Sequence, residues 1–431
     1  MTASTEKARE FLAAHGLDVA SINPETVLED FLDEMKKGLE GLKSSLVMIP
    51  TFITIDKPVP AGRPVIAVDA GGTNLRVAMV VFDDRGAPTV DNYSCYEMPG
   101  IQKEVGKEEF FNLFARHLLP VAGLADSVGF CFSYAAEITP DCDGKLLTWT
   151  KEIKAPEVVG EFIGRNIADR LKAKGFSPKI TLLNDTVATL LAGKSVGGAR
   201  RYSSYIGFIL GTGTNTSYVE RNSLITKRND LDPEESQAIN VESGNFGRHP
   251  RGNLDLAFDR TTANPGAYTF EKMISGAYLG GLGLHVLKAA AQEGLLSPQG
   301  VGVISDLAHL STIQVDAFLR NPFAAPEHPI SVLAEEDMVT VLHLFTAVIE
   351  RAALLAAINI SAAVLKSAGG TSPLHPVCVN ADGSTFYKTK GFRCRVEEHL
   401  RKILWSRDIY YEIIRVDDSP LIGAAVAGLT R

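Results

Sequence analysis

Two short glycine-containing segments have the residue types that phosphate binding requires. They are Asp69-Ala-Gly71-Gly72-Thr73-Asn74 and Gly211-Thr212-Gly213-Thr214. Glycine has no Cβ to block a close approach, and successive backbone N–H groups in such a turn can point at one anion. Thr73 and Thr212 add hydroxyl donors. One such segment alone is equally typical of a tight hairpin, but two in one chain, both after apolar strands, favour phosphate binding.

A carboxylate follows another apolar strand, in the segment Leu182-Leu183-Asn184-Asp185-Thr186. An Asn-Asp pair at this place could simply cap the N-terminus of a helix. Beside phosphate-binding turns, however, a carboxylate at a strand end is placed like a catalytic base. Both interpretations of Asp185 stay open at this point.

Other polar residues could complete a site for phosphoryl transfer. That reaction needs cradled phosphates, a magnesium site, an acceptor hydroxyl held in line and a base beside it. Lys151 lies near a strand end, and Glu242 and Glu271 supply carboxylates. Carboxylates bind sugar hydroxyls through charge-assisted hydrogen bonds. Taken singly, each of these residues is more often a solvated surface charge.

The elements that must position these residues alternate between strands and helices. Apolar runs predict strands at 65–68, 75–82, 205–210 and 216–220. Strand, glycine turn and strand predict a β-hairpin, not the strand-to-helix turn of a P-loop. Helical spacing predicts helices at 26–46, 110–119, 158–174 and 337–366, the last one buried. We therefore expect an α/β chain with two intertwined domains of related topology, each with a glycine hairpin.

Composition restricts the class of protein. The chain has 431 residues, of which 45% are hydrophobic and 22% charged, and its net charge is -8. These values fit a soluble globular protein with two domains and no general attraction for nucleic acid or anionic membranes. The five cysteines form no zinc-binding cluster. Because no signal peptide and no apolar stretch of ~20 residues is evident, we expect a cytoplasmic protein with no membrane partner.

Further short motifs accompany the glycine turns in a fixed order. They are Met48-Ile-Pro-Thr-Phe52, Phe132-Ser133, Trp149-Thr150-Lys151, Asn184-Asp185-Thr186, Asn215, Glu242, Phe246-Gly247, Asn264-Pro-Gly266, residues 271–280, Asp382-Gly383-Ser384, Tyr387-Lys388, Ser419 and Gly423-Ala-Ala425. From about residue 48 to the C-terminus, this order resembles that of the hexokinase family, sugar kinases of the actin-like ATPase superfamily. Each motif is short, but together they are specific.

The resemblance implies a two-domain actin-like ATPase (ribonuclease H-like) fold with a central interdomain cleft. Residues 64–183 plus 418–431 would form a small domain with the first phosphate motif and the sugar loop. Residues 1–63 plus 184–417 would form a large domain with Asp185 and the second phosphate and adenosine motifs. The implied reaction transfers the γ-phosphoryl group of MgATP to the 6-hydroxyl of a hexose, the first step of glycolysis. Glucose is the first candidate hexose, with mannose and fructose as others.

The resemblance also implies roles for individual residues. Asp185 would be the catalytic base, and Lys151 would stabilise charge on the transferring phosphoryl group. The residues implied for sugar binding are Ser133, Thr150, Asn184, Asn215, Glu242 and Glu271. The residues implied for binding ATP and its phosphates are Asp69, Gly71, Gly72, Thr73, Asn74, Arg76, Gly211, Thr212, Gly213, Asp382, Gly383, Ser384 and Ser419. Asp69 would also lie near Mg²⁺, through water.

The chain departs from the family pattern at several places. Tyr134-Ala135 stands where the family has Phe-Pro, and Glu152-Ile153 where it has Gly-Phe. Both changes lie in the sugar loop and leave the range of hexoses open. Ser243 stands where many members have Trp, and Gly281 replaces a usual Glu. Thr389-Lys390-Gly391 and Pro420 depart from the pattern in the nucleotide-binding segments.

Two other functions are compatible with parts of this pattern. A bacterial sugar kinase of the repressor-related type would carry a clustered cysteine zinc motif, which the chain lacks. A sugar-sensing regulator could keep the fold without catalysis, but it would need neither Asp185 nor Lys151. The sequence therefore favours an active hexokinase, and it predicts no particular oligomeric state.

Overall fold

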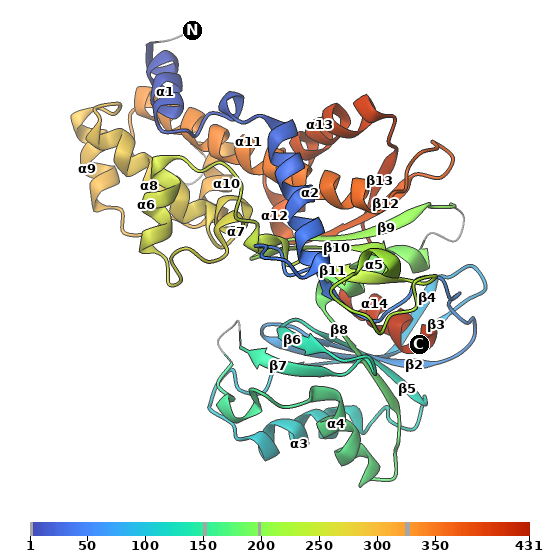
Figure 1. Ribbon diagram of the computed structural model, residues 1–431. Helices are drawn as coiled ribbons and strands as arrows, with labels where there is room; N and C mark the ends of the chain where they lie inside the picture. The colour runs from blue at the N-terminus through green and yellow to red at the C-terminus, as the bar shows by residue number, and fades with distance from the viewer. Residues whose placement is uncertain (1–2, 150–152, 197–199, 324–327) are drawn as a thin grey trace.

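Two mixed β-sheets form the centres of two lobes in the computed structural model, which describes residues 3–149, 153–196, 200–323 and 328–431. The first sheet has the strand order β4-β3-β2-β5-β8 and lies in the lower lobe of Figure 1. Its strands are β2 (Val65–Ala70), β3 (Asn74–Phe82), β4 (Pro88–Glu97), β5 (Ser127–Phe132) and β8 (Lys179–Leu183). A small hairpin, β6 (Ala135–Ile138) and β7 (Gly144–Thr148), lies beside it.

The second sheet repeats the arrangement of the first. Its order is β1-β11-β10-β9-β12-β13, with strands β1 (Ile49–Pro50), β9 (Ser204–Leu210), β10 (Thr214–Arg221), β11 (Ser236–Asn240), β12 (Val377–Asp382) and β13 (Tyr411–Ile414). In each sheet an antiparallel meander is followed by two strands that pair in parallel. The predicted internal repeat of strand, glycine turn and strand is thus present in both lobes.

Parallel pairing brings the predicted site segments to common sheet edges. In the first sheet, Asp69 pairs with Cys131, and Cys131 pairs with Leu183. The residues that follow these strands, 71, 133 and 184, therefore leave the sheet at the same edge. In the second sheet, Asp382 pairs with Ile209, so the turn at 211 and the segment at 383 also leave together. Ligands in such sheets bind beyond the carboxyl ends of the strands.

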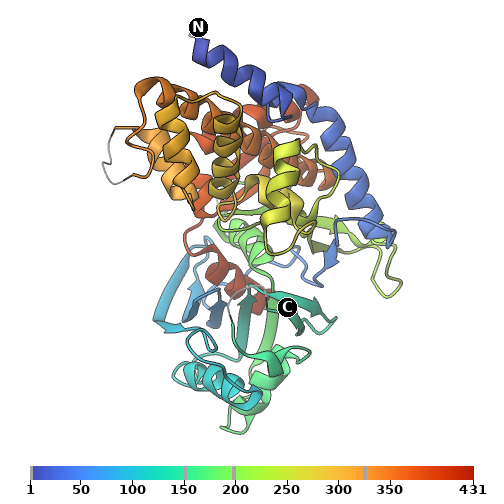
Figure 2. The same cartoon turned by 90° about the vertical axis from the view of Figure 1, so that its left-hand side faces the viewer.

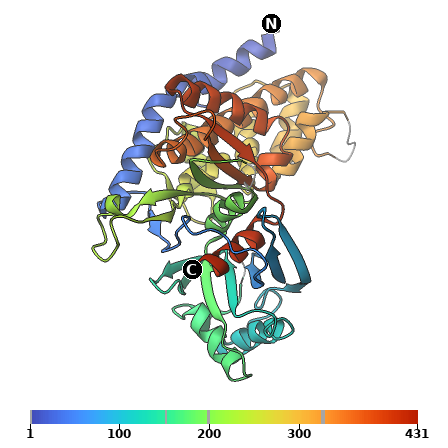
Figure 3. The ribbon, with the colours of Figure 1, turned by 90° about the vertical axis from the view of Figure 1, so that its right-hand side faces the viewer.

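The lobes meet through two helices, α5 (Asp185–Val196) and α14 (Ser419–Thr430). Although α5 follows β8 of the first sheet, it packs on β9 and β12 of the second. Helix α14 follows β13 of the second sheet but packs on β2, β5 and β8 of the first. Figure 3 shows α14, in red, at the junction between the lobes. The chain also passes between the lobes from β1 to β2, but α5 and α14 are the helices that pack against each other where the lobes meet.

The α5–α14 crossing is close because small residues line it. A Cβ built on Gly423 of α14 would lie 1.7 Å from the carbonyl oxygen of Ala188 in α5. On the other side of α14, a Cβ on Gly129 of β5 would lie 1.7 Å from the carbonyl oxygen of Ala424. Neither position can accept a side chain without a backbone shift, so the helix is held tightly between the other helix and the sheet.

The remaining helices cover the outer faces of the two lobes. In the lower lobe these are α3 (Lys107–Leu118) and α4 (Ile163–Lys172). The upper lobe holds α1 (Ala3–Ala14), α2 (Pro24–Glu40), α6 (Asn253–Thr261), α7 (Thr269–Ile274), α8 (Leu279–Gln292), α9 (Pro298–Asp306), α10 (Thr312–Arg320), α11 (Glu335–Lys366), α12 (Ser384–Lys388) and α13 (Phe392–Leu404). Figure 2 shows these helices gathered above the smaller lobe.

Helix α11 is the core helix of the upper lobe, as its composition predicts. It is long and apolar enough to cross a membrane by length and composition alone, but 72% of its most apolar window is buried inside the protein. It packs against α1, α2, α8 and α13 and against β9 and β10. Burial of this kind is expected for the central helix of a globular lobe.

Two predicted helices are shorter in the structure because backbone signals outweigh the apolar pattern. The helix expected at 26–46 is α2, which begins at Pro24 after the Asn23 cap. It ends at Gly41, whose φ of 73° closes a left-handed cap, and Leu42 beyond it is 59% exposed. The helix expected at 158–174 begins only at Ile163, because a 3₁₀ turn that starts at Pro156 precedes it.

We predict that Gly423→Ala destabilises the protein by about 1–3 kcal/mol, because the added methyl group would overpack the α5–α14 crossing. Urea unfolding monitored by circular dichroism measures the change. The matched control is Gly302→Ala in α9, where an added Cβ meets nothing within 4 Å. This control should raise the free energy of unfolding by up to about 1 kcal/mol. Equal effects of the two substitutions would contradict the proposed tight crossing.

Candidate functional site

The first glycine turn joins β2 to β3 and is held by backbone hydrogen bonds. The N–H of Gly71 donates to the carbonyl oxygen of Asn74 at 3.0 Å, and the N–H of Met98 donates to the carbonyl oxygen of Thr73 at 2.9 Å. Thr73 and Asn74 are exposed, whereas Gly71 and Gly72 are partly exposed. The turn thus presents backbone and hydroxyl donors to solvent at the edge where the predicted site lies.

Charged residues flank this turn on the side of the lobe junction. Asp69 is only 6% exposed at the end of β2. Arg76 lies opposite it on β3, with its Nη1 3.5 Å from Asp69 Oδ2 and 3.6 Å from Asp418 Oδ1. Asp418 directly precedes α14. Arg76 therefore connects the first phosphate turn to the start of the helix that crosses between the lobes.

The second glycine turn lies against the predicted adenosine segment. Gly383 has a φ of 113°, and a Cβ there would lie 2.2 Å from the carbonyl oxygen of Leu210. The carbonyl oxygen of Gly211 accepts hydrogen bonds from Thr385 Oγ1 at 2.8 Å and from the N–H of Gly276 at 2.8 Å. Only glycine fits such a close approach in this left-handed conformation. The turn 211–213 and the segment 382–384 are thus one unit, with Ser384 exposed at its surface.

Carboxamide and carboxylate groups gather beside the second turn. Asn215 Nδ2 donates to Glu242 Oε1 at 3.1 Å and to Asn240 Oδ1 at 2.8 Å. Asn240 Nδ2 also donates to Glu242 Oε1, at 2.8 Å. On α7, Glu271 Oε2 accepts a hydrogen bond from the N–H of Thr214 at 2.9 Å. The structure therefore brings together Asn215, Glu242 and Glu271, three of the residues predicted to bind sugar.

Burial raises the pKa of both glutamates, and a neighbouring carboxylate raises each one further. Burial is the larger cause for Glu242, and the charge of Asp185 adds to it, while hydrogen bonds from Asn240 and Asn215 act in the opposite direction. Burial also dominates for Glu271, and the charge of Glu242 raises its pKa further. These carboxylates lack enough partners within the protein to compensate for their desolvation. A ligand that donates hydrogen bonds would stabilise their ionised forms.

Asp185 lies at the N-terminus of α5, between the carboxylates and the nucleotide segment. Its charge raises the pKa of Glu242, as described, and also that of Asp382, for which burial is the larger cause. Asp185 is partly exposed. It is therefore within electrostatic range of both a predicted sugar residue and a predicted nucleotide residue, which is where a base for phosphoryl transfer is needed.

The helix-cap interpretation of the Asn-Asp pair also applies, but to its first member. Asn184 Oδ1 accepts a hydrogen bond from the N–H of Thr186 at 2.8 Å and thus caps α5. Because the Asn184 carbonyl group is occupied in this way, its Nδ2 group is the part that remains for a sugar hydroxyl. The cap does not use the carboxylate of Asp185, which is therefore available to act as a base.

The predicted sugar loop is only partly described. Ser133 follows β5, and its N–H donates to the carbonyl oxygen of Ala70 at 3.2 Å, so it lies beside the first phosphate turn. Thr150 and Lys151 lie outside the described residues. Their predicted roles in sugar binding and in stabilising the transferring phosphoryl group remain predictions.

The side chain of Ser419 serves the fold. It is fully buried, its Oγ donates to the carbonyl oxygen of Val416 at 2.7 Å, and it accepts from Asn380 Nδ2 at 3.0 Å. Pro420 follows it and has no N–H. The hydroxyl of Ser419 thus fixes the start of α14, and the role of this residue in phosphate binding remains a prediction.

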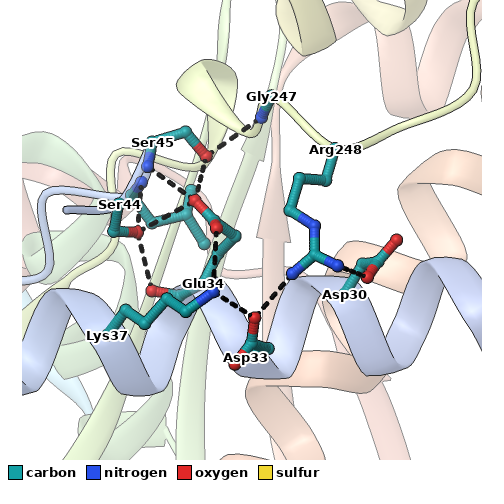
Figure 4. Close-up of polar contacts among 9 residues, drawn as sticks. Asp30, Asp33, Glu34, Lys37, Ser44, Ser45, Gly247 and Arg248 are labelled. Atoms are coloured by element: carbon teal, nitrogen blue, oxygen red, sulfur yellow. Dashed lines mark hydrogen bonds and ion pairs between the residues drawn. The ribbon is translucent and has the colours of Figure 1, made fainter. Parts of the chain in front are cut away.

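The segment that follows Glu242 is anchored to α2, as Figure 4 shows. Arg248 forms an ion pair with Asp33 at 2.5 Å, and the N–H of Gly247 donates to Ser45 Oγ at 3.0 Å. The N–H and the hydroxyl of Ser45 donate to Glu34 Oε2 at 2.6 and 2.8 Å. Burial alone would raise the pKa of Glu34, but the donors from Ser45 and Ser44 lower it. This network holds the predicted sugar-binding segment in place.

Sequence reasoning missed the residues that support the site from within. Asn380 is fully buried on β12 and donates to the carbonyl oxygen of Thr189 in α5 at 2.7 Å, as well as to Ser419. Asn240, the last residue of β11, orients Glu242 two positions further along the chain. A buried asparagine in a strand was the available signal for both, because such a side chain must find partners.

The carboxylates of the site fit Mg²⁺ bound together with substrate phosphates and water. Among the described residues, no group of three or more His, Cys, Asp or Glu side chains is placed to hold a metal ion. Mg²⁺ needs no such cage, since it keeps several waters and is commonly bound by one or two carboxylates together with substrate phosphates. Asp69, buried at a strand end beside the first phosphate turn, supplies a carboxylate of this kind.

Family models cover most of the chain. Two models, both described as Hexokinase, match residues 7–195 and 205–430. The chain is 30% identical to Hexokinase-2 of Candida albicans over 94% of this chain and 88% of that protein. It is also 30% identical to Glucokinase-1 of Kluyveromyces lactis over 93% of each chain.

Solved structures share the fold. The hexokinase of Schistosoma mansoni, complexed with glucose, superposes with a TM-score of 0.79 over 100% of both chains at 24% identity. A hexokinase of the ROK type from Thermus thermophilus superposes less well, with a TM-score of 0.51 over 85% of this chain at 15% identity. The fold is thus the two-domain sugar kinase fold. By its sequence matches, the chain belongs to the hexokinase family of ATP-dependent sugar kinases.

Proposed function

We propose that this hexokinase transfers the γ-phosphoryl group of MgATP to the 6-hydroxyl of glucose, with Asp185 as the base. The position of Asp185 carries the proposal, because its charge acts on both Glu242 and Asp382. Glu242 belongs to the predicted sugar-binding group and Asp382 to the predicted nucleotide segment. A base between the two substrates can accept the hydroxyl proton as the phosphoryl group is transferred.

Glucose fits the donor and acceptor pattern of the site. Its hydroxyls would donate to the carboxylates of Glu242 and Glu271, and Asn215, whose Nδ2 donates to Glu242 Oε1 at 3.1 Å, would hold the Glu242 carboxylate beside the sugar. Bonds of this kind to ionised groups are stronger than neutral ones. They would hold the sugar in one orientation, which is a large part of catalysis when the acceptor must lie in line with the phosphoryl group. The name of the Schistosoma mansoni complex supports glucose as the hexose.

The nucleotide phosphates would bind between the two glycine turns. The turns 71–73 and 211–213 lie at the ends of β2 and β9, one in each lobe, and Asp382, Gly383 and Ser384 lie against the second turn. Mg²⁺, when bound near Asp69, would neutralise charge on the phosphates. Lys151 is proposed to act on the transferring phosphoryl group from the sugar loop. The division into domains 64–183 plus 418–431 and 1–63 plus 184–417 would make closure of the lobes part of the cycle.

A non-catalytic sugar sensor is the alternative that a direct assay excludes. Measuring ADP release in the presence of glucose, mannose, fructose and N-acetylglucosamine tests activity and the choice of hexose together. Sugar binding without transfer to any of these hexoses would identify a sensor and refute the proposal.

We predict that Asp185→Ala lowers kcat by at least ~10²-fold, because a general base typically contributes ~10²–10⁴ in rate. Glucose binding, measured by calorimetry, should change little, since Asp185 acts mainly on the proton of the reacting hydroxyl. Asp84→Ala, in an exposed turn, is the matched control and should keep full activity. Turnover near the unsubstituted rate in Asp185→Ala would assign the base elsewhere.

We predict that the KM for glucose rises as the pH falls toward the raised pKa values of Glu242 and Glu271. A raised pKa means that these acids protonate at higher pH than an ordinary glutamate, and a protonated carboxyl loses its charge-assisted bonds to the sugar. Glu271→Gln should raise the KM for glucose about tenfold or more and flatten this acid limb. The measurement is kcat and KM across the pH range for both proteins. An identical pH dependence in the two would show that Glu271 does not bind the sugar as a carboxylate.

A further inference from the structure

A tyrosine of the sugar loop makes a direct contact with the first phosphate turn. Tyr134 is 4% exposed, and its hydroxyl donates to the carbonyl oxygen of Gly71 at 2.5 Å. The family resemblance places Tyr134 in the sugar loop, where its departure from the family pattern leaves the range of hexoses open. In the structure its ring is instead part of the apolar core below the turn. Its hydroxyl reaches out of that core to the backbone of the predicted phosphate site.

The accepting carbonyl belongs to the peptide bond between Gly71 and Gly72. Glycine explores backbone conformations more freely than any other residue, so a peptide between two glycines can turn over easily. A peptide is planar and trans, and its C=O and N–H point in opposite directions. Holding the Gly71 carbonyl toward Tyr134 therefore directs the N–H of Gly72 away from the core. Among the residues that the structure describes, that N–H meets no acceptor.

Aromatic residues at the two ends of the predicted sugar loop hold the Tyr134 ring in place. Its ring packs edge-on against Trp149, with centroids 4.9 Å apart, and against Phe132 at 4.9 Å. Trp149 Nε1 donates to the carbonyl oxygen of Ala155 at 2.8 Å. Phe132 precedes Ser133, and Trp149 precedes Thr150 and Lys151. The aromatic group of Phe132, Tyr134 and Trp149 therefore lies next to both ends of the predicted sugar loop.

Burial raises the pKa of Tyr134, and the charge of Asp69 raises it further. The hydroxyl consequently keeps its proton throughout the physiological pH range. It can serve as a permanent donor to the Gly71 carbonyl.

We propose that Tyr134 is a positioning residue that couples the sugar loop to the nucleotide site by fixing the Gly71–Gly72 peptide, so that the Gly72 N–H points at a phosphate oxygen of ATP. This inference rests on the proposed function. The family pattern has Phe-Pro where this chain has Tyr134-Ala135. Proline restricts its own backbone and that of the residue before it. The hydroxyl contact of Tyr134 supplies here a restraint that the missing proline would otherwise give.

Tyr134→Phe removes the hydroxyl and keeps the ring, so it tests the contact alone. We expect the Kd of a non-hydrolysable MgATP analogue, measured by calorimetry, and the KM for MgATP to rise about three- to tenfold, the effect of one lost hydrogen bond. The Kd of glucose without nucleotide should stay unchanged. The matched control is Tyr411→Phe, whose hydroxyl donates to the backbone carbonyl of Glu397 at 3.4 Å, far along β13 from the turns. It should leave both affinities unchanged.

The double variant Tyr134→Phe/Ala135→Pro tests the role of the restraint. Ala135 is the first residue of β6, where proline is tolerated, and the second substitution should restore nucleotide affinity. Unchanged nucleotide affinity in Tyr134→Phe would overturn the proposal. So would an equal loss of glucose and nucleotide affinity with a lowered melting temperature, since this would show a general structural role. If the unsubstituted protein transfers no phosphoryl group to any hexose, the proposed function fails, whereas the calorimetric comparison still tests the contact.

Discussion

The close packing of α5 against α14 is the constraint on which the rest of the molecule depends. Each helix follows a strand of one sheet and packs on the other sheet, and Gly423 lets their backbones approach to contact distance. Both helices begin at the site: α5 starts at Asp185, and Asp418 precedes α14. Asn380 on β12 donates hydrogen bonds both to α5 and to the start of α14. The helix crossing therefore sets the separation between the phosphate turns and the carboxylates.

The site also contains carboxyl groups that destabilise the folded protein when no ligand is bound. Glu242, Glu271 and Asp382 are largely buried carboxyls, and neighbouring carboxylates raise the pKa of each one further. Such an arrangement opposes folding at neutral pH, because the folded state binds protons more tightly than the unfolded chain. It becomes favourable when ligands supply the missing donors. Rigid elements, including α2, to which Arg248 is anchored by its ion pair with Asp33, hold these groups ready for that purpose.

Much of the fold and the site can be predicted from the sequence because their signals are local. The glycine turns, the apolar strands beside them and the Asp185 segment are continuous in the sequence, and their repetition indicates two related sheets. The supporting contacts cannot be predicted in this way. The Tyr134 contact with Gly71 spans 63 positions, and that of Asn380 with Thr189 spans 191. The predicted end of α2 was wrong because the apolar pattern continues past Gly41, whereas the left-handed cap at Gly41 ends the helix. Ser419 is a motif residue whose buried hydroxyl also has a structural contact that the sequence does not predict.

The position of α14 has a consequence for synthesis on the ribosome. The first sheet is made early, from residues 65–183, yet the helix that covers β2, β5 and β8 lies at 419–430. During translation the emerging first lobe would thus expose an apolar face that includes Ala67 and Cys131, residues fully buried in the finished protein. Domains generally fold in the order in which they emerge, but this lobe cannot complete its core until α14 has been made, after all the strands of the upper lobe.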